Sequence, residues 1–385
     1  MIPRDLNNWI EISESCYRHN LHFFKNLLRE KTEFSVVIKS NAYGHGMKEI
    51  AGLAIKHGAD SFCVHSLDEA LDLRHNGFLC DILIMGPVLF RRLPEVILQD
   101  LRLVVYNIEA IQWLKKITAE MNRPVRIHLK LETGTFRQGI REEDLNKFIS
   151  ELKSTSLLKV EAVYTHFANI EDTTNHDYAY YQLALFNKMV SRIKNSGFPR
   201  VKCHTACSAA ILLFPETHFD MVRLGISQYG LWPSRETFVS YKIKHTKKGE
   251  NLLQPVLRWK TKVGQIKIAS ANQRVGYGGT FQTTRKSKIA VLPIGYADGY
   301  DRRLSNQSNV LIRGNRAPLR GRVCMNLIMV DITDIPGVKL EDPVTLIGED
   351  NRNRISIDDL SSLCGTINYE FITRLNWQIP RLIVK

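Results

Sequence analysis

The sequence lacks a long uninterrupted hydrophobic run. Its longest apolar stretches, such as residues 81–90, are broken by a charge or a Gly-Pro pair well before the ~20 residues that a bilayer helix needs. Residues 1–15 also lack the basic segment, apolar run and cleavage site of a secretory signal. These absences predict a protein with no membrane span, and the cytoplasm is the expected compartment.

Cysteine is sparse, and charge of one sign is not concentrated. The seven cysteines are scattered and odd in number, which indicates free thiols rather than a disulfide framework. Cys203, His204 and Cys207 have no second pair at zinc spacing, so no metal site is predicted. The net charge is 53 − 39 = +14, but the tightest basic group, 242–248, contains no interleaved aromatic residues. Nucleic-acid binding is therefore not expected.

What is present is an ordinary globular composition, 44% hydrophobic and 24% charged, which excludes disorder and collagen. A length of 385 residues favours two domains. Short apolar runs, typical of strands covered on both faces, occur at 36–39, 62–66, 81–85, 102–106, 125–131, 159–165, 201–205 and 221–225. Six of the seven separations between these eight runs leave room for a crossover helix, so the pattern predicts an α/β fold of the (β/α)₈ barrel type.

The pattern changes beyond about residue 245. Ser356 to Leu363 is predicted to be helical, whereas β-branched runs with Gly and Pro occupy 256–269, 287–295, 309–332, 343–348, 367–374 and 380–385. We therefore expect a barrel over 1–245 and a smaller, mainly β domain over 246–385, with a boundary uncertain by about ten residues.

Polar residues follow or end several predicted strands, at the barrel face where active sites lie. They are Lys39, Lys130, His166, Ser208 and Arg223. Burying the charge of a lysine in a barrel mouth costs free energy unless the amine is paired with an anion or takes part in the chemistry. Lys39 is therefore a candidate amine nucleophile. Each residue alone could be a rim charge, a core histidine or a salt-bridge partner. Five such residues at one face favour a site.

The run from Val36 to Gly46 closely resembles the cofactor-lysine signature of the alanine racemases, pyridoxal-phosphate enzymes built from a barrel and a β domain. The resemblance continues in order along nearly the whole chain, through Glu132-Thr133-Gly134, Thr165-His166-Phe167-Ala168, Cys207-Ser208-Ala209-Ala210, Arg223-Leu224-Gly225-Ile226, Gly276-Tyr277-Gly278-Gly279-Thr280, Gly295-Tyr296-Ala297-Asp298-Gly299, Cys324-Met325 and Ile367-Asn368-Tyr369-Glu370.

This resemblance implies that Lys39 carries the cofactor and acts as the base on one face of the substrate. Tyr277 is implied to be the acid/base on the opposite face, because inversion needs two groups. Arg223 is implied to face the pyridine nitrogen, where a guanidinium always donates. His166 is expected to contact Arg223 and fix it.

The resemblance also implies which residues bind the cofactor phosphate. Tyr43, Ser208 and Tyr369 are implied to hold it through their hydroxyls. The backbone N–H groups of Gly225 and Ile226 complete this expected set, because glycine allows a close approach.

Arg137 is implied to bind near the substrate carboxylate, since a planar two-pronged donor suits an anion. Lys130 occupies a position that is often carbamylated in the family, which would give Arg137 an anionic partner. Tyr296 resembles an entryway residue, and Met325 one whose backbone meets the substrate carboxylate. The family also implies a head-to-tail homodimer in which Lys39 and Tyr277 of different subunits share each active site.

The resemblance predicts interconversion of L-alanine and D-alanine, supplying D-alanine for peptidoglycan. Two departures from the usual pattern, Asn326 and Thr135-Phe136, leave open a serine or broad-specificity racemase. A decarboxylase of basic amino acids would bring a glycine-rich phosphate triplet that is not seen here. A small carrier of pyridoxal phosphate resembles only the barrel, and residues 250–385 argue against it.

Overall fold

The structure is a computed structural model that describes residues 5–245 and 252–385. Contacts divide the chain into two compact units. The barrel unit comprises Tyr17–Ser40 and Ile50–Gln254, and the β unit comprises Met1–Cys16, Asn41–Glu49 and Pro255–Lys385. The boundary predicted at 245/246 adjoins the undescribed residues 246–251, and the domain limits 1–245 and 246–385 stay a prediction.

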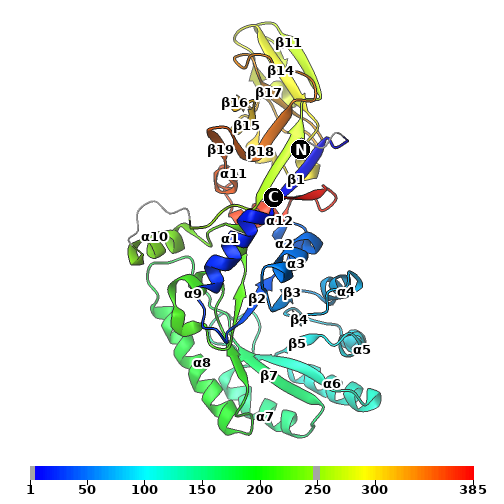
Figure 1. The fold of residues 1–385 in the computed structure, drawn as a ribbon, viewed down its shortest axis with the longest axis vertical. Coiled ribbons are helices and arrows are strands. Elements are labelled where there is room, and N and C mark those ends of the chain that lie inside the picture. Colours follow the sequence, from blue (N-terminus) through cyan, green and yellow to red (C-terminus); the bar gives the residue numbers. More distant parts are fainter. Residues whose placement is uncertain (1–4, 246–251) are drawn as a thin grey trace. The chain divides into compact units, whose positions relative to one another are not determined.

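Eight parallel strands form the barrel unit, in the order β8-β7-β6-β5-β4-β3-β2-β9. Figure 1 labels β2 to β5 and β7 of this sheet. They are β2 (Glu33–Val37), β3 (Ser61–Val64), β4 (Asp81–Ile84), β5 (Arg102–Val105), β6 (Val125–Lys130), β7 (Leu158–Tyr164), β8 (Lys202–His204) and β9 (Met221–Leu224). No ladder joins β8 to β9, but Arg223 N donates to Ala206 O at 3.0 Å across the gap. The barrel is therefore nearly closed, and the predicted fold class is confirmed.

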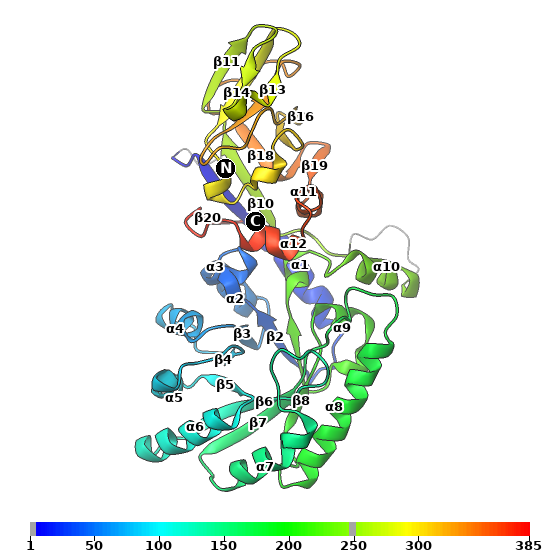
Figure 2. The ribbon, with the colours of Figure 1, turned by 180° about the vertical axis from the view of Figure 1, so that it is seen from behind.

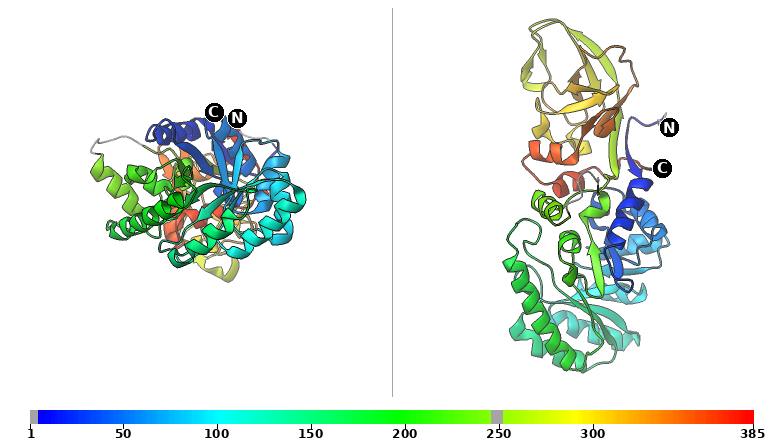
Figure 3. Two further views of the ribbon diagram at one scale, coloured as in Figure 1. Left: turned by 90° about the horizontal axis from the view of Figure 1, so that it is seen from below. Right: turned by 60° about the vertical axis from the view of Figure 1, so that its left-hand side comes forward.

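Helices lie outside these strands, as seen in Figure 2 and in the left view of Figure 3. They are α1 (Glu14–Lys25), α3 (Met47–Lys56), α4 (Leu67–His75), α5 (Leu93–Leu98), α6 (Ile108–Met121), α7 (Leu145–Lys153), α8 (Asp177–Asn195), α9 (Ser208–Leu213) and α10 (Arg235–Lys244). Local chemistry sets their ends. At α4, Ser66 accepts from Glu69 N while the Glu69 carboxylate accepts from Ser66 N, which is a capping box.

The barrel interior is charged where the strands begin. Arg102 on β5 is only 4% exposed and binds three carboxylates at 2.6–2.8 Å. These belong to Glu33 on β2, Asp81 on β4 and Glu161 on β7. Barrel interiors are usually filled by branched apolar side chains, so this base is unusual. Four strands are joined by one guanidinium, which fixes their mutual register.

The β unit contains three sheets. The largest has the order β16-β15-β18-β10-β1-β20 with β19 on β18, beside a three-stranded β11-β14-β17 sheet and the pair β12-β13. The strands are β1 (Asn8–Ser13), β10 (Leu257–Lys262), β11 (Gln265–Ala269), β12 (Arg274–Val275), β13 (Phe281–Gln282), β14 (Ser287–Leu292), β15 (Asn309–Ile312), β16 (Asn315–Pro318), β17 (Ile328–Asp331), β18 (Pro343–Asp350), β19 (Asn353–Ile355) and β20 (Arg381–Val384). Because β1 pairs with β10 and β20, the start of the chain belongs to the β unit.

Two helices in the C-terminal region test the sequence reading. The predicted helix at 356–363 is confirmed as α11 (Ile357–Leu363), which Ser356 caps by accepting from Asp359 N at 3.0 Å. The predicted β run at 367–374 is wrong, because these residues form α12 (Asn368–Thr373). Its β-branched residues favour a strand, but its buried residues 368, 371 and 372 follow helical spacing.

Within residues 5–245 and 252–385, no helix combines the length and apolar character needed to cross a bilayer.

Candidate active site

Lys39 lies just beyond the strand that the sequence assigns to it. Strand β2 ends at Val37, and Lys39 begins the short turn α2 (Lys39–Tyr43). Residues 40–43 all have φ between +52° and +53°, a left-handed turn built from non-glycine residues. Such a conformation costs roughly 1–2 kcal/mol per residue, so the surrounding structure must hold it.

Hydrogen bonds hold this turn at both ends. In the barrel unit, Ser40 N donates to Glu69 Oε1 at 2.6 Å, and the same carboxylate caps α4. In the β unit, Asn41 Oδ1 accepts from Met47 N at 2.8 Å. Arg381 donates to Gly44 O at 2.9 Å. The strained segment after Lys39 is thus fixed by side chains distant in sequence.

Four predicted site residues of the barrel unit form a cluster of cations. Burial and then the nearby Arg137 lower the pKa of Lys39. Burial, Arg137 and Arg223 lower the pKa of Lys130 to about 8. Burial, followed by these same four cations, lowers the pKa of His166 well below its ordinary value. The structure therefore brings Lys39, Lys130, Arg137, Arg223 and His166 together.

Arg223 on β9 is 4% exposed and is held by three acceptors. Its NH1 bonds His204 Nδ1, and its NH2 donates to the carbonyls of Thr165 and Thr205 at 3.0 Å each. These bonds use three of the five guanidinium N–H groups. The histidine hydrogen-bonded to Arg223 is His204 on β8, which was not predicted. Arg223 is also the strongest charge acting on buried His166, whose role in fixing Arg223 stays a prediction. His204 points into the barrel from a neighbouring strand, whereas His166 follows the end of β7.

The predicted phosphate ligands of the barrel unit also converge. Ser208 begins α9, and Ile226 begins the 3₁₀ turn η4 (Ile226–Tyr229). Ser208 Oγ accepts from Gly225 N at 3.0 Å and from Ser227 N at 3.4 Å. Two backbone N–H groups thus converge on the Ser208 hydroxyl at one buried point, and these are donor types that bind anions in proteins.

In the β unit, the two tyrosines assigned to the phosphate lie near each other. Tyr43 ends the left-handed turn, and Tyr369 lies in α12. Their ring centroids are 6.1 Å apart with planes at 51°. Gly44 follows Tyr43 so closely against α12 that a Cβ there would approach Ile372 O to 2.1 Å. Glycine at 44 is therefore required for this approach.

Tyr277 is presented on a rigid glycine frame of the β unit. It starts the 3₁₀ turn η5 (Tyr277–Gly279), and its side chain is 72% exposed. Gly276 and Gly278 flank it with φ of +73° and +72°, values that disfavour other residues. A Cβ on Gly276 would come within 2.6 Å of Met329 Cε. The Tyr277 side chain is therefore largely exposed at the surface of the β unit.

Tyr296 and Met325, also in the β unit, are held side by side by backbone hydrogen bonds. Tyr296 N donates to Cys324 O at 3.0 Å, and Ala297 N donates to Met325 O at 2.9 Å. Both side chains are substantially exposed, at 43% and 57%. The structure therefore brings these two predicted substrate-side residues together.

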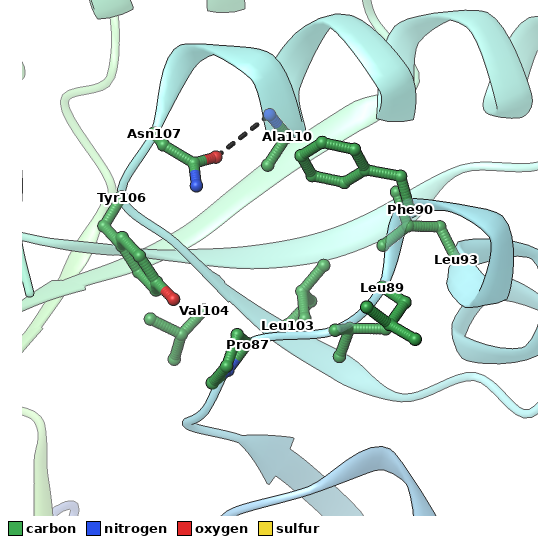
Figure 4. A pocket seen from close by; sticks show the side chains of 10 residues that line it. Pro87, Leu89, Phe90, Leu93, Leu103, Val104, Tyr106, Asn107 and Ala110 are labelled. Carbon is green, nitrogen blue, oxygen red and sulfur yellow. Dashed lines mark hydrogen bonds between the residues drawn. The ribbon is translucent and has the colours of Figure 1, made fainter.

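A small apolar cavity of about 210 Å³ lies at the ends of β4 and β5 (Figure 4). Pro87, Phe90 and Val104 line it, and Tyr106 forms one side. The Tyr106 hydroxyl accepts from Gln138 Nε2 at 3.2 Å, while Gln138 Oε1 accepts from Lys130 Nζ at 3.1 Å. The cavity wall is thus connected to the cation cluster through Gln138.

The residues present fit pyridoxal phosphate. The cofactor carries a phosphate and a phenolic oxygen, and the substrate adds a carboxylate. Four cations meet here, and the nearby negative charges that act on Lys39 and Lys130 come mainly from Glu69 and Glu132. An anionic ligand would relieve this excess of positive charge. The converging hydroxyl and N–H groups at Ser208 supply the donors that a phosphate needs.

Sequence reasoning missed three residues that hold the site: His204, Gln138 and Glu69. One signal was available for His204, since it is a histidine inside an apolar run at a strand end. It was considered only together with Cys203 and Cys207, for which no metal site is predicted. Gln138 and Glu69 carry no comparable local signal, because their partners are set by the fold.

Comparison with known proteins gives matches over nearly the whole chain. The family model "Alanine racemase, N-terminal domain" matches residues 12–233, and "Alanine racemase, C-terminal domain" matches 256–383. An alanine racemase of Leptospira interrogans is 38% identical over 98% of this chain and 96% of its own length. The solved alanine racemase of Clostridium difficile 630 superposes with a TM-score of 0.91 at 32% identity, covering 99% and 97% of the two chains. That of Bacillus anthracis, with bound L-Ala-P, gives 0.90 at 34% identity over 100% and 96%.

Proposed function

This chain belongs to the alanine racemase family, whose members are pyridoxal-phosphate-dependent isomerases, and from that premise we propose that it interconverts L-alanine and D-alanine with Lys39 and Tyr277 as its two bases. The observation that supports this most strongly is the cation cluster around Lys39, Lys130, Arg137 and Arg223. When bound, the cofactor supplies an electron sink that stabilises the charge left on the α-carbon as its proton departs.

Lys39 takes the proton from one face of the substrate. Its pKa is lowered by burial and by Arg137, so a larger fraction of the amine is neutral than for an exposed lysine. A neutral Nζ can accept the α-proton and return it. The fixed left-handed turn that follows Lys39 restricts where Nζ can move.

Tyr277 serves the opposite face, through its phenolic oxygen. A single base would return most protons to the face from which they came. The exposed side chain on its glycine frame supports a role toward a partner subunit. Family members are typically homodimers that act on alanine. We infer a head-to-tail homodimer in which Tyr277 of the partner subunit completes each barrel site.

Arg137 binds the substrate carboxylate in this proposal, with Met325 and Tyr296 of the partner subunit at the entrance. A second cation beside Arg137 needs neutralisation. With its pKa lowered to about 8, Lys130 is neutral often enough to react with carbon dioxide, and its carbamate would be an anion beside Arg137. Labelled bicarbonate and carbon NMR would test this, with Lys130→Arg as the control that cannot form the signal.

The remaining residues hold the cofactor. Ser208, Gly225, Ile226, Tyr43 and Tyr369 bind its phosphate. Arg223 donates to the pyridine nitrogen, and a guanidinium cannot give a proton up to it at working pH. His166 lies within the cation cluster and would face the cofactor when it is bound. The cytoplasm is the proposed location, where the product serves peptidoglycan synthesis.

The deciding experiment is a chiral assay with L-alanine, D-alanine and L-serine as separate substrates. We expect inversion of alanine in both directions, without loss of the carboxylate. Faster inversion of serine would favour the broad-specificity alternative, for which exposed Phe136 beside Arg137 is the structural reason. Release of carbon dioxide, or no reaction with any substrate after loading with pyridoxal phosphate, would contradict the proposal.

A further inference from the structure

A chain of polar side chains crosses the barrel interior from Arg223 to the charged base. Arg223 on β9 bonds His204 Nδ1 on β8. The other nitrogen of that ring, His204 Nε2, lies 3.1 Å from His128 Nδ1 on β6. His128 Nε2 then faces Glu161 Oε2 on β7 at 3.5 Å. Arg102 holds the second oxygen of this carboxylate at 2.8 Å.

The two ends of this chain fix the position of every proton between them. A guanidinium only donates and an ionised carboxylate only accepts. His204 Nδ1 must therefore accept, so the neutral ring carries its proton on Nε2 and donates to His128 Nδ1. His128 in turn carries its proton on Nε2, pointing at Glu161. The other tautomer of His204 would set an N–H group against Arg223, and that of His128 would set one against His204.

The surroundings keep both rings neutral and the carboxylate ionised. Burial and then Arg223 lower the pKa of His204 well below its ordinary value, and burial lowers that of His128. Burial alone would raise the pKa of Glu161, but the hydrogen bond with His128 and the charge of Arg102 lower it to about 2. At neutral pH, all three groups hold the protonation states that the chain requires.

Packing leaves these groups no alternative. His128 Nε2 and Glu161 Oε2 are both buried and face each other at 3.5 Å, and within the described residues neither forms a hydrogen bond of normal geometry with any other group. Buried polar atoms are normally paired, so the two must serve each other. The Tyr164 ring stacks on the His204 ring, with centroids 4.6 Å apart and planes at 5°. The Arg223 guanidinium carbon lies 4.9 Å from the centroid of the Tyr164 ring. The imidazole of His204 is therefore held in one orientation.

We propose that His128 and Glu161 are positioning residues for the racemisation: they fix the tautomer of His204 and thereby hold Arg223 oriented as a donor toward its ligand. Neither residue needs to touch substrate or cofactor. The inference rests on the proposed function for its kinetic consequence, but the tautomers themselves can be measured without any reaction.

The direct test is long-range proton–nitrogen NMR on protein labelled at the histidine ring nitrogens. We expect His204 and His128 both to be neutral with the proton on Nε2, and the signals are assigned by their loss in His204→Asn and His128→Gln. Glu161→Gln is expected to move the His128 signal and, to a lesser extent, that of His204. A proton on Nδ1 of either ring, or a doubly protonated ring, would overturn the proposal.

The kinetic test compares two replacements of one residue. Glutamine at 128 offers an oxygen to His204 and an amide N–H to Glu161, whereas leucine offers neither. We expect His128→Leu to lower kcat in both directions by roughly tenfold or more, with KM changed less than about threefold. His128→Gln should remain within about threefold of the parent kcat. His218→Leu, which removes another buried histidine whose Nε2 lies 3.1 Å from Ile211 O, is the control for lost stability.

The outcomes separate this inference from the function on which it rests. Equal impairment of the leucine and glutamine variants, or a kcat loss no larger than in His218→Leu, would contradict the positioning role. If His128→Leu does not fold, Glu161→Gln provides the kinetic comparison, with an expected loss of about threefold in kcat that Glu161→Leu should exceed. If the tautomers are as predicted but the protein does not racemise alanine, the proposed function is wrong and the proton arrangement is still supported.

Discussion

The barrel unit and the β unit use their interiors differently. In the barrel unit, charged and polar groups such as Arg102, His128 and Arg223 are buried inside the ring of strands. Both units have apolar cores, but among the described residues of the β unit Lys262 is the one buried charged side chain, and large residues such as Trp9 and Trp259 fill its interior. Burying paired charges contributes little net stability but specifies orientation, whereas apolar packing contributes stability. The barrel unit therefore fixes the orientation of its buried polar side chains, whereas the β unit provides a stable support for exposed Tyr277.

Removing the barrel base should have the largest effect. We expect Lys39→Ala to lower racemisation by about a thousandfold or more, because the variant loses both the cofactor attachment and one of two bases. Borohydride reduction of the parent protein, followed by peptide mapping, should place the cofactor on Lys39. Lys159→Ala, at an exposed position on β7, is the matched control and should retain activity. An adduct on another lysine would refute the assignment.

Mixing two inactive variants would test whether the barrel unit of one subunit and the β unit of another contribute to the same active site. Lys39→Ala and Tyr277→Phe chains should each be inactive alone. After subunits exchange at random, about half of the dimers are hybrids, and each hybrid has one intact site, so roughly a quarter of all sites should regain activity. Persistent inactivity after verified exchange would show that both bases come from the same chain.

Arg223→Glu tests whether the buried guanidinium controls the chemistry. A carboxyl group in place of Arg223 would allow the pyridine nitrogen to be protonated, which strengthens the electron sink and prolongs the carbanion. We expect racemisation to slow by roughly a hundredfold. Pyruvate should form as a side product of transamination, detectable with a coupled dehydrogenase. An unchanged rate without pyruvate would show that Arg223 does not face the ring.

The smallest expected effect is a difference in acid sensitivity. Burial lowers the pKa values of His128, His166 and His204 below the ordinary 6.5. The β unit has one such histidine, His45 in its 41–49 segment, and residues 255–385 contain none. As the pH falls through 6.5, the unfolded chain binds protons that the folded barrel does not, so its free energy of unfolding decreases.

Hydrogen exchange at about pH 7.5 and about pH 5, corrected for intrinsic rates, would measure this difference. Protection should fall more in β6, β7 and β8 than in β14 and β17. An equal loss in both regions would show that the buried histidines do not set the acid sensitivity.

Part of the fold was accessible from periodicity alone. Eight apolar runs separated by helix-length segments predicted the barrel, because strands covered on both faces have few alternatives. The strand predicted at 36–39 lies a few residues too far along the chain. The observed strand β2 is Glu33–Val37, and Lys39 already belongs to a left-handed turn. Nothing in a sequence without glycine at 40–43 signals positive φ. That conformation depends on bonds from Glu69 and Arg381, which are distant in the chain.

The candidate site divides in the same way. Residue types and their order along the chain are enough to name Lys39, Arg223, Ser208 and Tyr277 through their motifs. Which groups hold these residues follows from the folded structure. His204, which no motif marks, bonds Arg223, and β1 joins the β unit although it precedes the barrel. The physical reason is that motifs are local along the chain, whereas hydrogen-bond partners and strand neighbours are chosen by proximity in space after folding.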